Sequence, residues 1–142
     1  WHRMGDIGYF DEEGYLWFFG RKVDLVQLAE HELYTDCCEN VFNVHSDVKR
    51  SALIPFVDLE GVSAAAIVIQ PKSNFSIKDE EEKKRLTKEI LTIAEGNWVT
   101  KKIKHVLIKE SFPVDVRHNA KIKRDILTVW AAALPEGNLE AK

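Results

Sequence analysis

A polar segment near the C-terminus carries the densest group of side chains that could bind an anion. Residues 113–124 read PVDVRHNAKIKR, and five basic side chains stand within the last eight positions: Arg117, His118, Lys121, Lys123 and Arg124. The chain as a whole has a formal net charge of −3, so this positive charge is local. Such a segment suits a phosphate or carboxylate ligand. The other interpretation is a solvated basic loop without a ligand, because charge runs usually lie at the surface.

Apolar segments flank this loop and must position it. Residues 105–109 (HVLIK) predict a strand before the loop, and residues 122–134 predict a helix after it. Functional side chains are often carried by loops that rigid elements hold at both ends. The expected arrangement therefore presents the basic side chains from a loop between a strand and a helix.

The N-terminal third predicts a hairpin, a joint and a helix. In residues 8–20, aromatic and strand-favouring residues flank the turn sequence DEEG, which predicts a β-hairpin. Residues 20–24 (GRKVD) form a polar joint, and residues 25–28 predict a short strand. A helix is expected over residues 34–43, with Thr35 as its N-cap.

The middle of the chain predicts a small sheet and a long helix. Residues 48–56 and 62–70 read as two strands, and the continuous apolar run within the second is typical of a central strand. Residues 79–96 predict the clearest helix, with Asp79 at its start and an apolar stripe that includes Leu86 and Ile90. This order predicts an α+β fold: an N-terminal β-hairpin and hinge, then a small mixed sheet with helices packed against it.

Composition limits the classes of protein to consider. The chain has 142 residues, of which 45% are hydrophobic, as in ordinary globular proteins. It begins with Trp1 rather than Met, and we expect a domain excised from a longer protein. No apolar run approaches the about 18 residues that a transmembrane helix needs. A pI near 6.0 argues against a nucleic-acid-binding protein.

Two adjacent cysteines point to a reducing compartment. Neighbouring cysteines rarely form a disulfide because the bridge strains the peptide between them, so Cys37 and Cys38 predict buried or half-buried thiols. Free thiols favour the cytoplasm. His31 and His45 flank the pair, but their spacing is no recognised zinc pattern, and we expect no metal site in this chain.

Both ends of the chain resemble the adenylate-forming superfamily, which includes acyl-CoA synthetases, peptide-synthetase adenylation domains and luciferases. Residues 5–24 (GDIGYFDEEGYLWFFGRKVD) match a family signature almost continuously, and residues 120–124 (AKIKR) match its C-terminal lysine motif. The resemblance implies an ATP-dependent, AMP-forming ligase. Residues 1–24 would end its N-terminal lobe, residues 25–134 would form a mobile C-terminal lobe, and residues 135–142 would be a flexible tail.

The same resemblance implies roles for individual residues. Asp6 resembles the carboxylate that accepts hydrogen bonds from the two ribose hydroxyls of ATP or AMP, and Arg21 resembles an arginine that also contacts the nucleotide. Asp24 resembles the hinge about which the lobe rotates between two half-reactions. Lys121 resembles the catalytic lysine, whose ammonium group offsets negative charge while a substrate carboxylate attacks the α-phosphate.

Further expectations concern the anion contacts, the metal and the partners. Arg117 and His118 are possible contacts for a phosphate or carboxylate, and His118 could instead act as a base or hold the loop by hydrogen bonding. Family members use Mg²⁺ with ATP, and both would be bound mainly by the N-terminal adenylation domain, which this sequence lacks. The isolated chain is therefore expected to be inactive, with that domain and a carboxylic acid, expected to be a fatty acid, as partners.

Several positions depart from the family pattern. Ala120 replaces the usual Gly before the lysine, and the loop that precedes it is longer than usual. Gln27, Glu30 and Thr35 stand where the family has a basic strand, a Gly and a Pro. The Gly-containing segment lines the thiol tunnel in thioester-forming members, so the bulk and charge of Glu30 argue against CoA as a partner.

The lysine loop most resembles that of the β-lactone synthetases of bacterial long-chain olefin biosynthesis. These enzymes adenylate a β-hydroxy fatty acid, whose own hydroxyl then attacks the acyl-adenylate without a thiol. The alternatives are a fatty acyl-CoA or acyl-AMP ligase or a peptide-synthetase-type adenylation domain. A hypothesis of another class is a non-catalytic anion-binding module, which would not need the signature of residues 5–24.

Overall fold

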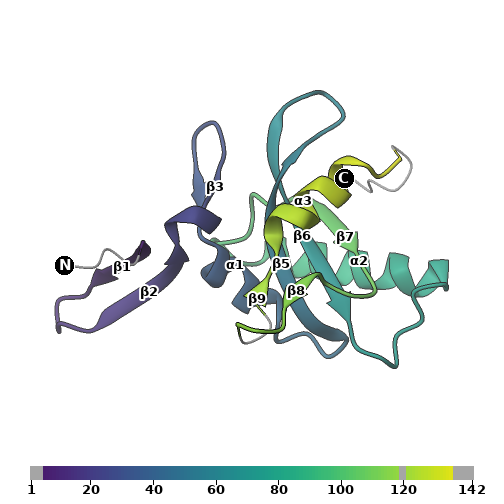
Figure 1. Ribbon diagram of the computed structural model, residues 1–142, viewed down its shortest axis with the longest axis horizontal. Coiled ribbons are helices and arrows are strands. Elements are labelled where there is room, and N and C mark those ends of the chain that lie inside the picture. The colour runs from purple at the N-terminus through teal and green to yellow at the C-terminus, as the bar shows by residue number, and fades with distance from the viewer. Residues whose placement is uncertain (1–4, 119–120, 136–142) are drawn as a thin grey trace.

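The computed structural model of the chain describes residues 5–118 and 121–135. A three-stranded sheet forms its centre, with strands β5 (Val48–Val57), β6 (Ser63–Pro71) and β7 (His105–Ile108) in the order β5-β6-β7 (Figure 1). β5 and β6 are antiparallel, whereas β6 and β7 are parallel, so the sheet is mixed. The apolar run within β6 lies in the central strand and is buried, which confirms the prediction from its sequence.

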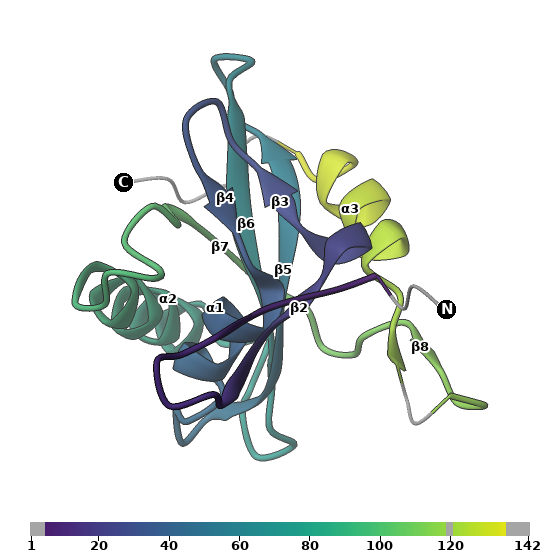
Figure 2. The same ribbon diagram turned by 90° about the vertical axis from the view of Figure 1, so that its left-hand side faces the viewer.

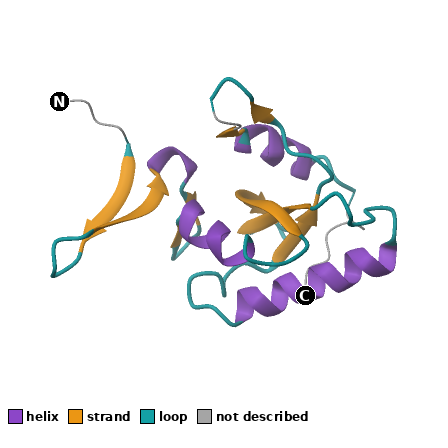
Figure 3. Cartoon of the chain, turned by 90° about the horizontal axis from the view of Figure 1, so that it is seen from below, coloured by secondary structure: helices purple, strands orange, loops and turns teal. Residues whose placement is uncertain are grey.

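Helices cover both faces of this sheet. α1 (Thr35–Phe42) and α2 (Glu80–Glu95) pack on one face, where Phe42, Leu86 and Ile90 are fully buried. α3 (Arg124–Ala132) packs on the other face through Leu127 and Ala131. Figure 3 shows the sheet between α3 and the long helix α2. The α+β fold expected from the order of the elements is therefore confirmed.

α2 connects the two parallel strands. A parallel pair needs a crossover connection, which here runs from the end of β6 through α2 to the start of β7. Asp79 caps the helix: its Oδ1 accepts hydrogen bonds from the backbone N–H of Glu81 at 3.0 Å and of Glu82 at 3.3 Å. Gly96 stands at its C-terminal end. The structure thus confirms the helix predicted over residues 79–96.

The N-terminal hairpin projects from the remainder of the chain in Figure 1, and it faces the viewer in Figure 2. It consists of β1 (Asp6–Phe10) and β2 (Leu16–Arg21), as predicted. Gly14 closes the turn with a φ of +85°, where glycine has no steric penalty. A short 3₁₀ turn (Lys22–Asp24) follows, and β3 (Val26–Gln27) then pairs with β4 (Glu32–Leu33) in a second, smaller hairpin.

The predicted N-cap of α1 is wrong. Tyr34 occupies the cap position without a side-chain hydrogen bond, and Thr35 is the first residue of the helix. The side chain of Thr35 is buried against the hairpin: a Cβ atom placed on Gly20 would lie 2.9 Å from the Thr35 Oγ1 atom. The Thr35 hydroxyl, which the sequence suggested as a helix cap, is therefore packed against the hairpin instead.

The predicted boundaries of the basic segment also need correction. Instead of one open loop, the segment contains two short antiparallel strands, β8 (Val114–Asp115) and β9 (Lys121–Ile122), which pair with each other. We call this pair of strands the lysine hairpin. Ile122 pairs with Val114 in this ladder, so the last helix begins at Arg124 and not at residue 122. Ala120 and residues 136–142, which hold nearly all of the expected tail, lie outside the described residues. No described helix is long and apolar enough to cross a bilayer.

Candidate active site

A cleft of about 790 Å³ lies where the N-terminal joint, the start of α1 and the β8–β9 hairpin meet. Among the charged side chains that line it are those of Arg21, Asp24, Asp36, Arg117, His118 and Lys121. Five of the six residues singled out from the sequence are therefore in one place. The sixth, Asp6, stands beside the cleft, because the register of the hairpin places it opposite Arg21.

Asp6 and Arg21 form a loose and exposed ion pair. The Oδ1 atom of Asp6 lies 4.0 Å from the Nε atom of Arg21, and the two side chains are 38% and 54% exposed. Exposed ion pairs contribute little to stability, so both groups are accessible to a ligand with hydroxyl or phosphate oxygens. Asp6 lies on β1 and Arg21 on β2, so the pairing of these two strands holds the two side chains close together.

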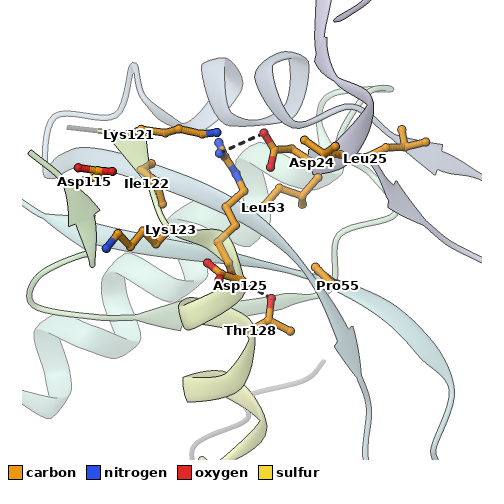
Figure 4. Close-up of a pocket in the computed structure, with 12 residues that line it drawn as sticks. Asp24, Leu25, Leu53, Pro55, Asp115, Lys121, Ile122, Lys123, Asp125 and Thr128 are labelled. Carbon is orange, nitrogen blue, oxygen red and sulfur yellow. Dashed lines mark hydrogen bonds and ion pairs between the residues drawn. The ribbon is translucent and has the colours of Figure 1, made fainter. Parts of the chain in front are cut away.

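Arg124 connects three elements at the base of the cleft. Its Nη2 atom donates to the Glu39 carboxylate at 2.7 and 2.8 Å, and its Nε atom donates to the same carboxylate at 3.1 Å. Its Nη1 atom lies 3.8 Å from Asp24 Oδ2, the ion pair marked in Figure 4. Since Arg124 follows Lys121 by three residues, this contact fixes the lysine hairpin against α1 and against the joint.

Glu39 was not recognised from the sequence as a functional residue. Its side chain is only 7% exposed, and its Oε1 also accepts a hydrogen bond from the backbone N–H of Leu53 at 2.9 Å. Burial raises the pKa of Glu39, and the Arg124 guanidinium opposes that shift. A signal was available: Glu39 lies on the buried face of α1 between Cys38 and Phe42, where an acidic residue requires a basic partner.

Lys121 is exposed and belongs to two adjoining clefts. Besides the first cleft it lines a second one of about 440 Å³, which Asp24, Leu53 and Thr128 also line (Figure 4). Its backbone N–H donates to the carbonyl oxygen of His118 at 3.1 Å, which closes the turn of the hairpin. The backbone of Lys121 is therefore fixed while its long side chain is presented to solvent.

Asp115 organises the other side of the lysine hairpin. Its Oδ1 accepts from the backbone N–H of Arg117 at 3.0 Å and from the Arg117 Nε at 3.3 Å, while its Oδ2 accepts from His118 Nδ1 at 3.0 Å. These hydrogen bonds, that from His118 first, lower the pKa of Asp115. Asp115 thus holds both candidate anion contacts at the rim of the cleft.

Asp36 gives the wall of the cleft an acid of altered pKa. Burial raises the pKa of Asp36, and the nearby carboxylates Asp24 and Asp6 add to this rise. The guanidinium groups of Arg124 and Arg21 oppose it. The cleft therefore combines carboxylates near the hinge with guanidinium and ammonium groups near the lysine hairpin. Such a set of donors fits an anionic ligand that also carries hydroxyl groups.

A separate group of side chains could be considered for a metal. One ligand atom each from His45, Asp47 and Glu89 lies within 4.8 Å of the others. Arg85 occupies this group, since its Nη2 donates to Asp47 at 2.8 Å and its Nη1 to Glu89 at 3.0 Å. The guanidinium supplies the positive charge that a metal would bring, so we interpret the group as an ion-pair network between α2 and the loop before β5.

Comparison with known proteins gave no match to a protein-family profile. The chain is 40% identical over 132 residues to the olefin beta-lactone synthetase of Stenotrophomonas maltophilia (strain K279a), a match that covers 93% of this chain and 23% of the relative. It is 31% identical to the 2-succinylbenzoate–CoA ligase of Listeria monocytogenes (strain EGD-e), over 89% of this chain and 25% of the relative. The chain thus spans about a quarter of the curated relatives it matches.

A solved structure agrees with these relatives. The fatty acyl CoA synthetase of Mycobacterium tuberculosis superimposes with a TM-score of 0.65 and 26% sequence identity, over 95% of this chain and 25% of that chain. In all three matches the chain corresponds to a minor part of a longer enzyme. Because the match to the solved structure covers 95% of this chain, the likeness includes nearly all of it, from the N-terminal hairpin to the last described helix.

Proposed function

This chain is homologous to the C-terminal part of the adenylate-forming enzymes, and we propose that it serves as their mobile lobe in an ATP-dependent, AMP-forming ligase. The reaction is the activation of a carboxylic acid as an acyl-adenylate. The complete enzyme would include a larger N-terminal domain, which binds most of the ATP, the Mg²⁺ and the acid.

One observation carries this proposal. Residues from opposite ends of the chain, Arg21 and Asp24 on one side and Lys121 on the other, line a single cleft. A sequence motif alone does not require its two halves to meet. Their meeting supports a shared ligand with anionic groups, and a nucleotide has the phosphates and ribose hydroxyls that these side chains suit.

Lys121 has the chemistry for the first half-reaction. When a carboxylate attacks the α-phosphate and pyrophosphate leaves, negative charge accumulates on the five-coordinate phosphorus. An ammonium group on a long flexible stem can follow that charge, and Lys121 is exposed on a hairpin fixed by Arg124. Mg²⁺ would accompany the phosphates of ATP, since the basic groups in this cleft suit phosphate oxygens rather than a metal.

The division of the chain into lobes follows from the same proposal. Residues up to 24 would end the N-terminal lobe, and residues 25–134 would form the mobile lobe. Asp24 is the hinge, because it ends the 3₁₀ turn between the large hairpin and β3. Residues at the ends of elements can absorb the backbone rotation that a lobe movement requires.

For the second half-reaction we favour β-lactone formation from a long-chain β-hydroxy acid. The relative at 40% identity is an olefin beta-lactone synthetase. Glu30 lies on the exposed turn between β3 and β4, where it adds negative charge to the segment expected to meet a thiol. A fatty acyl-CoA ligase is the second candidate, since the solved relative described above is a fatty acyl CoA synthetase.

The first test compares Lys121→Ala with the control Lys102→Ala in the full-length parent enzyme. Lys102 is exposed and lies in the turn before β7. With ATP, Mg²⁺ and a panel of fatty and β-hydroxy fatty acids, we expect Lys121→Ala to slow pyrophosphate release by about 100-fold or more, as removal of a transition-state charge contact does elsewhere. Unchanged release in Lys121→Ala would refute the proposed role of this lysine.

The product identifies the second half-reaction. A product formed without CoA and lighter than the hydroxy acid by one water supports the β-lactone. An acyl-CoA product would instead assign the chain to a CoA ligase and would refute the weight placed on Glu30. Mass spectrometry of the extracted products, with and without CoA, distinguishes the two.

A further inference from the structure

The β8–β9 hairpin carries a carboxylate–imidazole pair that the proposed adenylation step does not use. Asp115 Oδ2 lies 3.0 Å from His118 Nδ1, and the carboxylate is also held by the backbone N–H and the Nε of Arg117. The hydrogen bond from His118 and those from Arg117 lower the pKa of Asp115, so they favour its charged carboxylate form. A carboxylate at Nδ1 favours the tautomer in which this nitrogen carries the proton.

The remaining ring nitrogen is then the acceptor. With its proton on Nδ1, a neutral imidazole has a free lone pair on Nε2. The His118 side chain is 70% exposed and lines the same cleft as Lys121. An imidazole oriented in this way by a carboxylate is the arrangement by which proteins present a general base to a hydroxyl group.

Other polar side chains of the hairpin that line this cleft are less suited to accept a proton. Arg117 stays protonated in proteins, and the Lys121 ammonium is needed in its charged form for the adenylation step. The Asp115 carboxylate already accepts three hydrogen bonds. Across the cleft, the Asp24 carboxylate faces Arg124 at 3.8 Å, which leaves Asp36 as the alternative acceptor to test.

We propose that His118, oriented by Asp115, is the general base of the second half-reaction and deprotonates the β-hydroxyl of a β-hydroxyacyl-adenylate. This step rests on the proposed function, which supplies the acyl-adenylate. As the hydroxyl proton passes to His118 Nε2, the hydroxyl oxygen forms a bond to the acyl carbonyl carbon. The bond between that carbon and the phosphate oxygen breaks, and AMP leaves with the electron pair. The imidazolium then returns its proton to water or to the phosphate of AMP.

The nucleophile is already part of the acyl-adenylate, so no thiol has to enter and the lobe need not rotate before this step. One hairpin therefore serves both half-reactions. Lys121 stabilises the charge that develops on phosphorus, and His118, three residues earlier, activates the nucleophile that follows. A thiol loses its proton near neutral pH, whereas an alcohol does not, so a hydroxyl nucleophile has the greater need of a base. General bases of this kind contribute about 10²- to 10⁴-fold in rate.

The test uses the full-length parent enzyme and separates the two half-reactions. ATP–pyrophosphate exchange reports adenylation, and β-lactone mass reports ring closure, both with a long-chain β-hydroxy acid and without CoA. For His118→Gln we expect lactone formation to fall by about 10²-fold or more beyond any change in exchange. Asp115→Asn should lower lactone formation by a smaller factor, and Lys102→Gln should change neither reaction.

Chemical rescue distinguishes the loss of a base from a loss of lactone formation caused by altered structure. His118→Ala removes an exposed ring, so added imidazole can reach the position and should restore part of the lactone rate without changing exchange. Asp36→Asn is measured in parallel. Lactone formation that survives in His118→Gln but is lost in Asp36→Asn would overturn the inference in favour of Asp36.

The remaining outcomes are also decisive. Equal losses of exchange and of lactone in His118→Gln, with no rescue by imidazole, would make His118 a phosphate contact of the first half-reaction and refute the base. Wild-type enzyme that gives no exchange would refute the proposed function itself. Exchange without any lactone would leave adenylation in place and refute both the lactone step and the role of His118 as its base.

Discussion

Arg124 contacts two carboxylates at the base of the cleft, those of Glu39 and Asp24. Its guanidinium makes three hydrogen bonds to Glu39 and lies near Asp24, although its own side chain is only 16% exposed. A planar fork of donors is suited to such a bidentate partner, and a lysine could not reproduce it. Arg124 therefore determines how the lysine hairpin stands relative to α1.

Removal of this guanidinium should destabilise the fold. Arg124→Ala leaves the Glu39 carboxylate buried without its partner, and such losses cost about 3 kcal/mol or more. We expect urea denaturation of this chain to show that decrease in the free energy of unfolding. The double variant Glu39→Gln/Arg124→Ala should lose less than the sum of the two single variants, because each single variant leaves one unpaired charge and the double variant leaves none.

Lys101→Ala is the control for this cycle, since its side chain is exposed in the turn before β7. It should change the free energy of unfolding by no more than about 0.5 kcal/mol. Strict additivity of the Glu39 and Arg124 variants would contradict a direct coupling between the two residues.

Cys38 should be unreactive in the folded chain. Burial raises its pKa to about 12, and burial also raises the pKa of Cys37. Iodoacetamide reacts with the thiolate, so at pH 8 we expect mass spectrometry to find Cys38 unlabelled until urea is added. Rapid labelling of Cys38 without denaturant would show that this face of α1 opens.

The same shift gives a pH dependence. The unfolded chain releases the Cys38 proton near the ordinary value of 9.0, whereas the folded chain keeps it until about 12. Between these values the folded state binds more protons, so stability is full below 9.0 and falls as the pH rises. Cys38→Ala should show a smaller fall over this range, measured by urea denaturation at each pH.

The residues of the two local motifs lie close together in the fold, whereas a contact between residues far apart in the sequence could not be predicted. Five of the six singled-out residues lie in one cleft, and Asp6 lies beside it. Their roles remain predictions for the kinetic tests. Glu39 was missed because its partner is 85 residues away in the sequence, and nothing near Glu39 indicates which arginine it meets.

At the scale of elements, α2 shows how local chemistry defines a helix. Asp79 accepts two backbone hydrogen bonds at the N-terminus, and three acidic residues follow in the first turn, where the helix dipole favours negative charge. Asp79→Ala should lower the free energy of unfolding by about 1 kcal/mol. The exposed Lys88→Ala is the control, and an equal loss in both variants would show that the cap contributes nothing specific.

Long elements were predictable and two-residue strands were not. α2 carries an apolar stripe, and β5 and β6 carry long apolar segments, which are buried in the core of the fold. β8 and β9 have two residues each, and their pairing depends on the meeting of Val114 with Ile122 rather than on any periodicity. For the same reason, the sequence predicted that α3 starts at residue 122, whereas it starts two residues later at Arg124.

On the scale of the whole molecule, the N-terminal hairpin leaves many apolar side chains uncovered by the other described residues. Six large apolar or aromatic side chains of the hairpin and its turn are between 49% and 71% exposed: Tyr9, Phe10, Tyr15, Leu16, Trp17 and Phe18. A patch of this kind marks a surface that another body covers. This agrees with the proposal that residues 1–24 belong to the N-terminal lobe.

The patch leads to a prediction about the chain in isolation. Phe10 and Leu16 stand opposite each other in the hairpin register, so Phe10→Ser/Leu16→Ser removes apolar groups from neighbouring strands. We expect this double variant to reduce binding of the dye ANS by at least about half, because ANS binds exposed apolar surface. Val44→Ser, which changes a single exposed apolar residue, is the control and should leave the fluorescence unchanged.

The placement of α3 has a consequence for biosynthesis. A ribosome releases β5 and β6 early, and they can pair at once because only a short turn separates them. One face of that pair, with Ile54 and Val68, stays uncovered until residues 124–132 have been made. During this interval the nascent chain presents a bare apolar sheet, so a chaperone that shields strands would assist the protein most in the interval before its last described helix emerges.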